Sequence, residues 1–248
     1  MNIITNVISP NYSTRTNQIR FIIIHYTELN FEDALGRLCN PLSKVSSHYL
    51  IKSDGQIFQL VDTSNVAWHA GVSYWDGVER INDYSIGIEL DNLGHESFTV
   101  EQMNSCISLC NILIYRYNIP NVNILGHSDI AVDRKIDPGI FFDWELFASH
   151  NLGLWYDINV VSSSPSMMFE FGDYGAEILN LQKNLQKIGY KIDLTSVFDL
   201  QTNYVIRSFQ SHFHPKVIEK LGLDFYQDNN SKYQWDEISN LITMSLLI

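Results

Sequence analysis

Phe21-Ile22-Ile23-Ile24-His25 is a continuous run of aromatic and β-branched residues that ends in a histidine. Runs of this kind are typical of strands that are buried on both faces, and such strands lie in the middle of a sheet. A helix is predicted directly after the run, with Asn30 as its N-cap and Leu38 near its end, because apolar residues recur there at helical spacing. A buried strand followed by a helix indicates an α/β fold.

Further strands and a second helix surround this pair. The dipeptide Asp54-Gly55 separates two apolar runs, which is a strong signal for a β-hairpin. Strands are also predicted over residues 86–90 and 122–127, and a capping box of Thr99 with Gln102 begins a second helix. The hairpin makes the sheet mixed. Residues 1–160 are therefore predicted to form an α/β domain with a mixed central β-sheet flanked by helices.

The character of the chain changes after residue 160. Residues 161–171 are predicted to be a linker, because they contain the run Ser162-Ser163-Ser164-Pro165-Ser166. Residues 172–248 hold three short amphipathic patterns, over positions 178–188, 204–209 and 238–242. These patterns predict a small all-α domain of three helices, which at about 75 residues is large enough to fold alone.

Composition limits the partners of the chain. It has 248 residues, of which 45% are hydrophobic, and a formal net charge of −12 with 16 Lys and Arg. Because proteins that bind nucleic acid neutralise phosphates with Lys and Arg, no nucleic-acid partner is expected. The longest apolar runs are far shorter than the roughly 20 residues that cross a bilayer, so no transmembrane segment is expected either.

The cysteines and the N-terminus bear on the cellular compartment. Cys106 and Cys110 are one helical turn apart in an apolar stretch and are interpreted as core residues; a third cysteine makes the number odd. The first residues lack the basic region and apolar run of a secretory signal. A cytoplasmic location is therefore expected, with the periplasm or cell envelope, reached by non-classical export, as the alternative.

Two histidines and an aspartate are candidate metal ligands. His25 and His127 each end a predicted strand, and Asp137 lies in a Pro-Gly loop just beyond, so the three side chains can converge at one rim of the sheet. A histidine at a strand end is more often a hydrogen-bonded structural residue, and the long separations match no short zinc-finger spacing. The residues alone leave both interpretations open.

Glu89 is a candidate base. Side chains alternate along a strand, so Glu89 shares one face with Ser85 and Gly87, opposite an apolar face that goes to the core. Gly87 leaves space for another group to approach. The alternative is a carboxylate in a surface salt bridge on an edge strand. Lys135 follows Asp133 and Arg134, and a charge cluster of this kind is usually part of a solvated loop.

Six blocks, in order, carry a resemblance to a known family over residues 18–145. The blocks are Ile24-His25-Tyr26-Thr27, Val45-Ser46-Ser47-His48-Tyr49-Leu50-Ile51, Ala67-Trp68-His69-Ala70-Gly71, Asn82-Asp83-Tyr84-Ser85-Ile86-Gly87-Ile88-Glu89-Leu90, Gly126-His127-Ser128-Asp129 and Lys135-Ile136-Asp137-Pro138-Gly139. They resemble the zinc-dependent N-acetylmuramoyl-L-alanine amidases of the amidase-2 family, which includes AmpD-like enzymes and peptidoglycan recognition proteins.

The resemblance implies a role for each candidate residue. Zinc (Zn2+) would be bound by His25, His127 and Asp137, with a water in the open fourth position. Glu89 would take the proton of the attacking water and hand it to the leaving amine. Lys135 would face the oxyanion of the tetrahedral intermediate.

Substrate-binding residues also follow from the resemblance. Arg80 would bind a carboxylate of the stem peptide, for which a bidentate guanidinium is suited; the alternative is a solvated arginine that balances Glu79. Trp68 and His69 would wall the groove, or belong to the core. Ser47 stands where phage and recognition-protein relatives have a catalytic tyrosine. The AmpD-like branch uses the glutamate, here Glu89, instead of that tyrosine.

The C-terminal domain resembles the three-helix type of peptidoglycan-binding domain. The matching residues include Gly172-Asp173, Gly189-Tyr190 and Phe209-Gln210, whereas Thr195-Ser196-Val197 replaces the usual Asp-Gly of one loop. Wall binding is the implied function. His212 and His214 are a His-x-His pair that could hold metal, although a solvated helix end is the favoured interpretation.

The residues and the resemblance favour one function. The chain is predicted to cut the amide bond between N-acetylmuramic acid and L-alanine in peptidoglycan or muropeptides, and the alternative is a non-catalytic muropeptide-recognition protein of the same fold. The binding domain favours polymeric wall as the substrate, and the missing signal favours released anhydro-muropeptides.

Overall fold

The structure is a computed structural model that describes residues 2–157 and 165–247. The chain forms two compact units. The first unit comprises Met1–Ser73, Glu79–His127 and Asp137–Leu154, and the second comprises Tyr74–Val78, Ser128–Ile136 and Trp155–Ile248. Residues 74–78, 128–136 and 155–157, which were predicted to belong to the N-terminal domain, thus group with C-terminal residues. Residues 161–164 of the predicted linker lie outside the described residues, and its later part contains strand β11 (Met167–Glu170).

A six-stranded mixed sheet forms the centre of the first unit, as predicted. Its strand order is β1-β5-β4-β9-β3-β10. The strands are β1 (Ile3–Ile4), β3 (Phe21–Tyr26), β4 (Tyr49–Ile51), β5 (Ile57–Gln59), β9 (Ser85–Leu90) and β10 (Ile124–Gly126). Strand β3 is interior and parallel to both of its neighbours, while β4 and β5 form the predicted antiparallel hairpin. The all-apolar run that opens β3 is buried from end to end, because both faces of an interior strand are covered.

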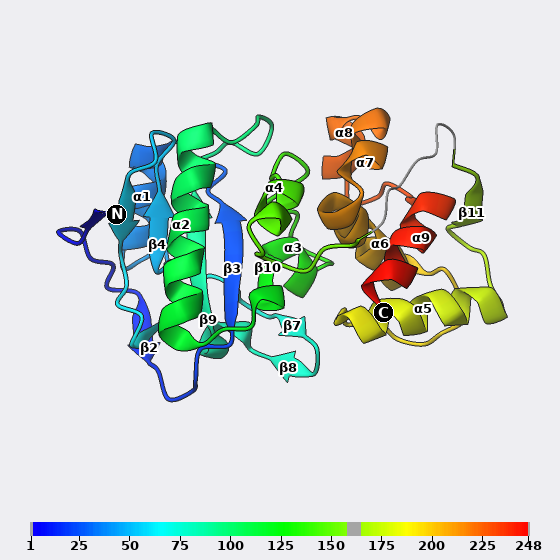
Figure 1. Cartoon of the computed structure of the whole chain (residues 1–248), viewed down its shortest axis with the longest axis horizontal. Coiled ribbons are helices and arrows are strands. Elements are labelled where there is room, and N and C mark those ends of the chain that lie inside the picture. Colours follow the sequence, from blue (N-terminus) through cyan, green and yellow to red (C-terminus); the bar gives the residue numbers. More distant parts are fainter. Residues whose placement is uncertain (1, 158–164, 248) are drawn as a thin grey trace. The chain divides into compact units, whose positions relative to one another are not determined.

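Two helices carry apolar side chains to the sheet. The Asn30 side chain caps α1 (Phe31–Cys39), and Leu38 of that helix clusters with Leu50 and Leu60. Helix α2 (Val100–Tyr117) is drawn in Figure 1 between β4 and β3 and runs roughly parallel to β3; it carries two buried free cysteines, as predicted. The capping box was half wrong: Thr99 accepts from the Gln102 N–H, but the Gln102 side chain donates to the carbonyls of Ile51 and Asp91 instead.

Short elements connect these parts of the chain. They are β2 (Tyr12–Thr14), which pairs with β6 (Asn65–Ala67), β7 (Tyr74–Trp75), which pairs with β8 (Val78–Glu79), the 3-10 helices Ile81–Tyr84 and Asn121–Asn123, and the short helices α3 (His127–Ile130) and α4 (Trp144–Ser149).

The second unit contains the three predicted helices and more. These are α5 (Ala176–Ile188), α6 (Leu200–Phe213) and α9 (Glu237–Leu246). Strand β12 (Gln234–Asp236), which pairs with β11, and helices α7 (Pro215–Leu221) and α8 (Leu223–Gln227) are additions that were not predicted. Pro215 at the first turn of α7 and Gly222 between the two helices were the signals to read.

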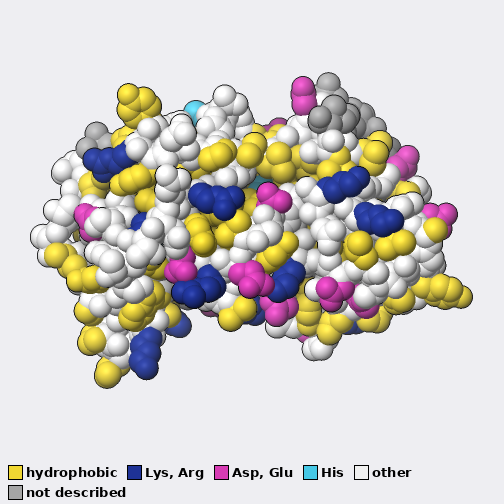
Figure 2. All heavy atoms as spheres, turned by 90° about the horizontal axis from the view of Figure 1, so that it is seen from below, with side chains coloured by type: hydrophobic (Ala, Val, Ile, Leu, Met, Phe, Trp, Pro, Cys, Tyr) yellow, Lys and Arg dark blue, Asp and Glu magenta, His cyan; other side chains and the backbone are white. Residues whose placement is uncertain are grey.

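The surface mixes charges with apolar groups. On the face drawn in Figure 2, Lys and Arg side chains stand apart from one another among acidic and hydrophobic ones. Among the helices of the described residues, none is both long enough and apolar enough to span a bilayer.

A buried histidine joins three parts of the first unit. The Nδ1 atom of His48 accepts the Gly87 N–H of β9 at 3.0 Å, and Nε2 lies 3.2 Å from the Asn65 carbonyl. Arg15 lies beside the ring and donates to four backbone carbonyls. Burial, and then the positive charge of Arg15, lower the pKa of His48 to about 3. His48 is therefore a neutral imidazole in the folded protein.

The depressed pKa of His48 makes stability depend on pH. An unfolded histidine gains a proton near pH 6.5, whereas folded His48 stays neutral until about pH 3, so stability is lost as the pH falls through this window. Urea unfolding at pH 7 and pH 5 should show that the wild type loses about 2 kcal/mol more than His48→Gln over this interval. Equal losses in the two proteins would contradict the assignment, because all other titrating groups are shared.

Candidate active site and metal centre

The register of three parallel strands gathers the candidate residues on one face of the sheet. His25 of β3 is the direct partner of Glu89 on β9, so their side chains point the same way. Gly126 of β10 pairs with Ile24, which places the next residue, His127, beside His25. Strand β9 is interior, so the alternative of Glu89 on an edge strand was wrong. The predicted convergence of side chains at one rim is a consequence of this register.

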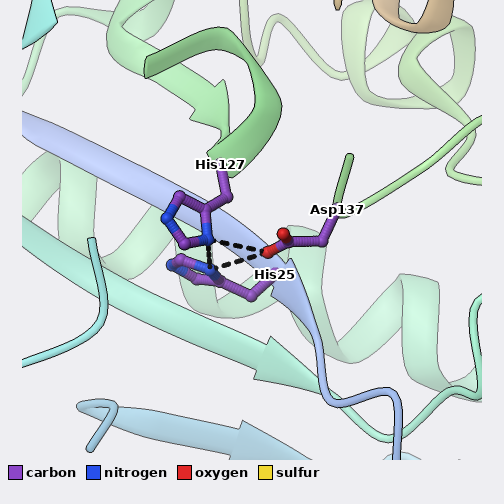
Figure 3. Close-up of side chains that lie close together, drawn as sticks. All are labelled: His25, His127 and Asp137. Carbon is purple, nitrogen blue, oxygen red and sulfur yellow. Dashed lines mark hydrogen bonds and ion pairs between the residues drawn. The ribbon is translucent and has the colours of Figure 1, made fainter. Parts of the chain in front are cut away.

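Three side chains meet within this site. The Nδ1 atoms of His25 and His127 are 3.0 Å apart, and each lies 3.0 Å from Oδ2 of Asp137 (Figure 3). All three residues are buried, with 1%, 3% and 7% exposure respectively. Figure 3 shows the side chains pointing toward one another from β3, from the start of α3 just after β10, and from the loop that holds Asp137. Within the described ranges these three residues are the one group found that could hold a metal ion.

The donor set fits a metal cation. His127 Nε2 lies 3.3 Å from the Ala70 carbonyl, which can only accept, so Nε2 carries the hydrogen and Nδ1 presents a lone pair. Burial alone would raise the pKa of Asp137, but His127 and His25 outweigh it and hold the pKa well below its usual range, so this carboxyl is ionised. Ligand atoms of a tetrahedral site with bonds of about 2.0–2.1 Å lie about 3.3 Å apart, close to the triangle seen here.

His69 lies behind the cluster. Its Nδ1 is 3.0 Å from His25 Nε2, and its Nε2 is 3.2 Å from the Ser85 hydroxyl. Burial and the neighbouring histidines lower the pKa of His69 well below its usual value, so the ring is neutral. When His25 Nδ1 is a ligand, His25 Nε2 carries a hydrogen and donates it to His69. This contact fixes the tautomer and orientation of His25.

Gly87 leaves space for the His69 ring, so His69 is the group whose approach was expected at this glycine from the sequence. A Cβ atom at position 87 would lie 2.5 Å from Cγ of His69. Ser47 is also buried here and donates to the Gly87 carbonyl at 2.8 Å. The orienting role of His69 was not predicted from the sequence. The block Ala67-Trp68-His69-Ala70-Gly71 supplies the partner of each Nε2 atom: the His69 ring lies beside His25 Nε2, and the Ala70 carbonyl lies beside His127 Nε2.

The other predicted site residues are placed as follows. Arg80 has an 82% exposed side chain that pairs with Asp83 at 3.0 Å rather than with Glu79. Trp68 is half-buried, and its indole N–H lies 3.4 Å from the Ser13 hydroxyl. Lys135 is half-buried in the segment of the second unit that precedes Asp137, and its N–H donates to the Ala131 carbonyl. Their roles toward substrate stay predictions.

The histidine pair of α6 does not behave as predicted. His212 is buried and its Nδ1 lies 2.8 Å from Asp129 Oδ2, so the interpretation of a solvated helix end was wrong for this residue. His214 is half-buried, 3.8 Å from an oxygen of Asp236. Each histidine faces a different carboxylate.

Comparison with known proteins defines the class of protein to which this fold and site belong. The family model described as N-acetylmuramoyl-L-alanine amidase (Amidase_2) matches residues 15–140, and a peptidoglycan binding domain model (PG_binding_1) matches residues 174–217. The chain belongs to the Amidase_2 family and is a hydrolase of amide bonds.

Individual relatives extend the match over most of the chain. N-acetylmuramoyl-L-alanine amidase AmiD of Escherichia coli (strain K12) is 35% identical over 218 residues, covering 81% of this chain and 76% of AmiD. The 1,6-anhydro-N-acetylmuramyl-L-alanine amidase AmpD of Haemophilus influenzae is 38% identical over 162 residues, covering 57% of this chain and 88% of AmpD.

Solved structures agree with the fold. The structure of Escherichia coli AmiD in complex with anhydro-N-acetylmuramic acid-L-Ala-D-gamma-Glu-L-Lys has a TM-score of 0.76 at 30% identity, over 95% of this chain and 91% of that chain. Pseudomonas aeruginosa AmpDH3 in complex with anhydromuramic pentapeptide has a TM-score of 0.72 at 27% identity, over 95% of each chain.

Proposed function

We propose that this chain is a zinc amidase that hydrolyses the bond between N-acetylmuramic acid, or its 1,6-anhydro form, and L-alanine. One observation carries the proposal: the buried cluster of His25, His127 and Asp137 lies on the same sheet face as Glu89, in a member of the amidase family. Two imidazole nitrogens and one carboxylate oxygen are a ligand set of catalytic zinc, which keeps a fourth position open.

The residues of the chain divide the chemistry among them. When bound, zinc polarises the substrate carbonyl and lowers the pKa of a coordinated water to about 7. Glu89 takes the proton of the attacking water and returns it to the departing amine, because an unprotonated amine is a poor leaving group. Lys135 stabilises the negative charge that develops on the carbonyl oxygen, a role worth about 3 kcal/mol for a preorganised group.

Substrate binding uses groups outside the cluster. Arg80 is exposed and exchanges Asp83 for a carboxylate of the stem peptide, a partner that a planar guanidinium holds with two hydrogen bonds. Trp68, which is half-buried, forms the wall of the groove, whereas the buried His69 acts through His25.

Anhydro-muropeptides are the proposed substrate class. Two relatives support it by what their names and complexes state: AmpD is named a 1,6-anhydro-N-acetylmuramyl-L-alanine amidase, and AmiD was solved with an anhydro-N-acetylmuramic acid tripeptide. The match of residues 174–217 to a peptidoglycan binding domain supports polymeric wall as a second ligand. Cell fractionation tests the compartment: cytoplasmic protein fits released muropeptides, and protein in the periplasm or envelope fits the wall.

The amidase proposal is tested by incubating the protein with an anhydro-N-acetylmuramyl tripeptide and analysing the products by mass spectrometry. Release of a free peptide with an N-terminal L-alanine, with the mass of one water added across the two products, is the expected result. Tight binding of an uncleaved muropeptide would instead identify a recognition protein and reject the enzyme.

His69 should control metal affinity through His25. Replacing it with phenylalanine keeps an aromatic ring but removes the acceptor for His25 Nε2–H, so zinc affinity should fall about 10- to 100-fold. His69→Gln is the matched variant, because its amide oxygen can still accept, and it should lose less. Zinc affinities measured by competition with a chelator test this prediction. Equal affinities for the wild type and His69→Phe would show that the contact between His69 and His25 has no role in metal binding.

A further inference from the structure

One face of helix α6 is polar and yet buried. Its members are Arg207, Ser208, Ser211 and His212. Burying a polar group lowers the stability of the fold unless the group is hydrogen-bonded, so the partners of these residues indicate the role of this face. Those partners include the segment Ser128–Ile136, which belongs to the same compact unit as α6.

Asp129 is the first point of attachment. One carboxylate oxygen, Oδ1, accepts from the Tyr190 hydroxyl at 3.0 Å and from the Ser208 hydroxyl at 3.2 Å. The other, Oδ2, lies 2.8 Å from His212 Nδ1. A carboxylate that is almost fully buried is thus surrounded by three groups from the C-terminal helices and the turn after α5.

Two further attachments hold the backbone of the segment. The guanidinium of Arg207 donates to the Val132 carbonyl at 2.8 Å and to Asn229 at 2.8 Å. The Tyr226 hydroxyl donates to the Ile136 carbonyl at 2.8 Å and also contacts Ser211 at 2.9 Å. The segment is therefore held near its start, its middle and its end.

The segment Ser128–Ile136 connects two of the proposed metal ligands. Its two ends are joined directly to His127 and Asp137, two of the three ligand residues, and Lys135 lies within it. We propose that Tyr190, Arg207, His212 and Tyr226 are positioning residues that hold the ligand-bearing segment in place, so that the C-terminal helices contribute to metal affinity. This inference rests on the proposed zinc site but not on turnover.

The inference changes the expected role of the C-terminal region. Residues 174–217, which match the peptidoglycan binding domain, include Tyr190 and the polar face of α6. That face is occupied by the segment before Asp137, so these polar groups serve the metal centre rather than a wall ligand.

A double variant of the full chain, Tyr190→Phe with Tyr226→Phe, tests the proposal. It keeps both buried rings and removes the two hydroxyl groups that donate to Asp129 and Ile136, together with the contact between Tyr226 and Ser211. We expect zinc affinity to fall about 10-fold and hydrogen exchange of the amides of residues 128–136 to become about 10-fold faster in the metal-free protein. Tyr233→Phe is the matched control, because its buried hydroxyl donates to the Tyr226 carbonyl and not to this segment.

The outcomes separate the possible explanations. A double variant with wild-type zinc affinity and wild-type exchange in residues 128–136 would overturn the proposal, as would an equal loss in Tyr233→Phe. If the double variant does not fold, Tyr226→Phe alone should give the same two changes at smaller size, and their absence would overturn the proposal. A wild-type protein that binds zinc but cleaves no muropeptide would reject the amidase function and leave this inference intact.

Discussion

Replacing Glu89 with glutamine should reduce turnover of an anhydro-muropeptide about 10²- to 10⁴-fold and leave the zinc content of the protein unchanged. Glutamine keeps the size of the side chain and its place opposite His25 but cannot take up a proton. The loss should appear in kcat, because proton transfer belongs to the reaction rather than to binding.

Glu101→Gln is the control for this experiment. Glu101 is an exposed carboxylate in the first turn of α2, outside the cluster of ligand residues, and its replacement should leave turnover within about two-fold of the wild type. Wild-type turnover in Glu89→Gln would remove this residue from the mechanism. A loss of zinc in the same variant would instead make Glu89 part of the metal centre.

Replacing Asp137 with asparagine should release the metal. Asp137 supplies the one negative charge of the cluster and lies 3.0 Å from both histidine nitrogens, and an amide oxygen of similar shape carries no net charge. Zinc affinity should fall more than 100-fold, beyond the loss expected for an orienting partner, and turnover should fall with it.

Asp133→Asn provides the comparison for Asp137→Asn. Asp133 is an exposed carboxylate four residues earlier, and its replacement removes the same charge from the same part of the chain. Zinc bound per chain, measured after dialysis by plasma mass spectrometry, should stay at the wild-type level in Asp133→Asn and fall in Asp137→Asn. Full zinc content in both variants would show that Asp137 is not a ligand.

The sheet could be predicted because its signals are local. The apolar run of β3 identifies an interior strand, and Asp54-Gly55 identifies the hairpin; both depend on neighbouring residues alone. Strand alternation separates Glu89 from the apolar face of its strand. The ligand roles of His25, His127 and Asp137 were predicted from the resemblance of the sequence blocks, because periodicity alone does not distinguish a metal ligand from a structural residue.

The remaining features depend on contacts between distant residues. His69 meets His25 only because Gly87 leaves space under its ring, and neither spacing nor alternation encodes that approach. The Gln102 side chain does not complete its capping box, because it donates to the carbonyls of Ile51 and Asp91, which lie 51 and 11 residues away in the chain. His212 looked like a solvated residue at a helix end, because its partner, Asp129, is 83 residues away.

The central claim is that His25, His127 and Asp137 bind zinc together, and metal analysis of the purified full chain tests it most directly. After dialysis against buffer without chelator, the wild type should retain about one zinc ion per chain, and a chelator should remove both the zinc and the turnover. Wild-type protein that retains no zinc, or that keeps full turnover after the zinc has been removed, would contradict the account.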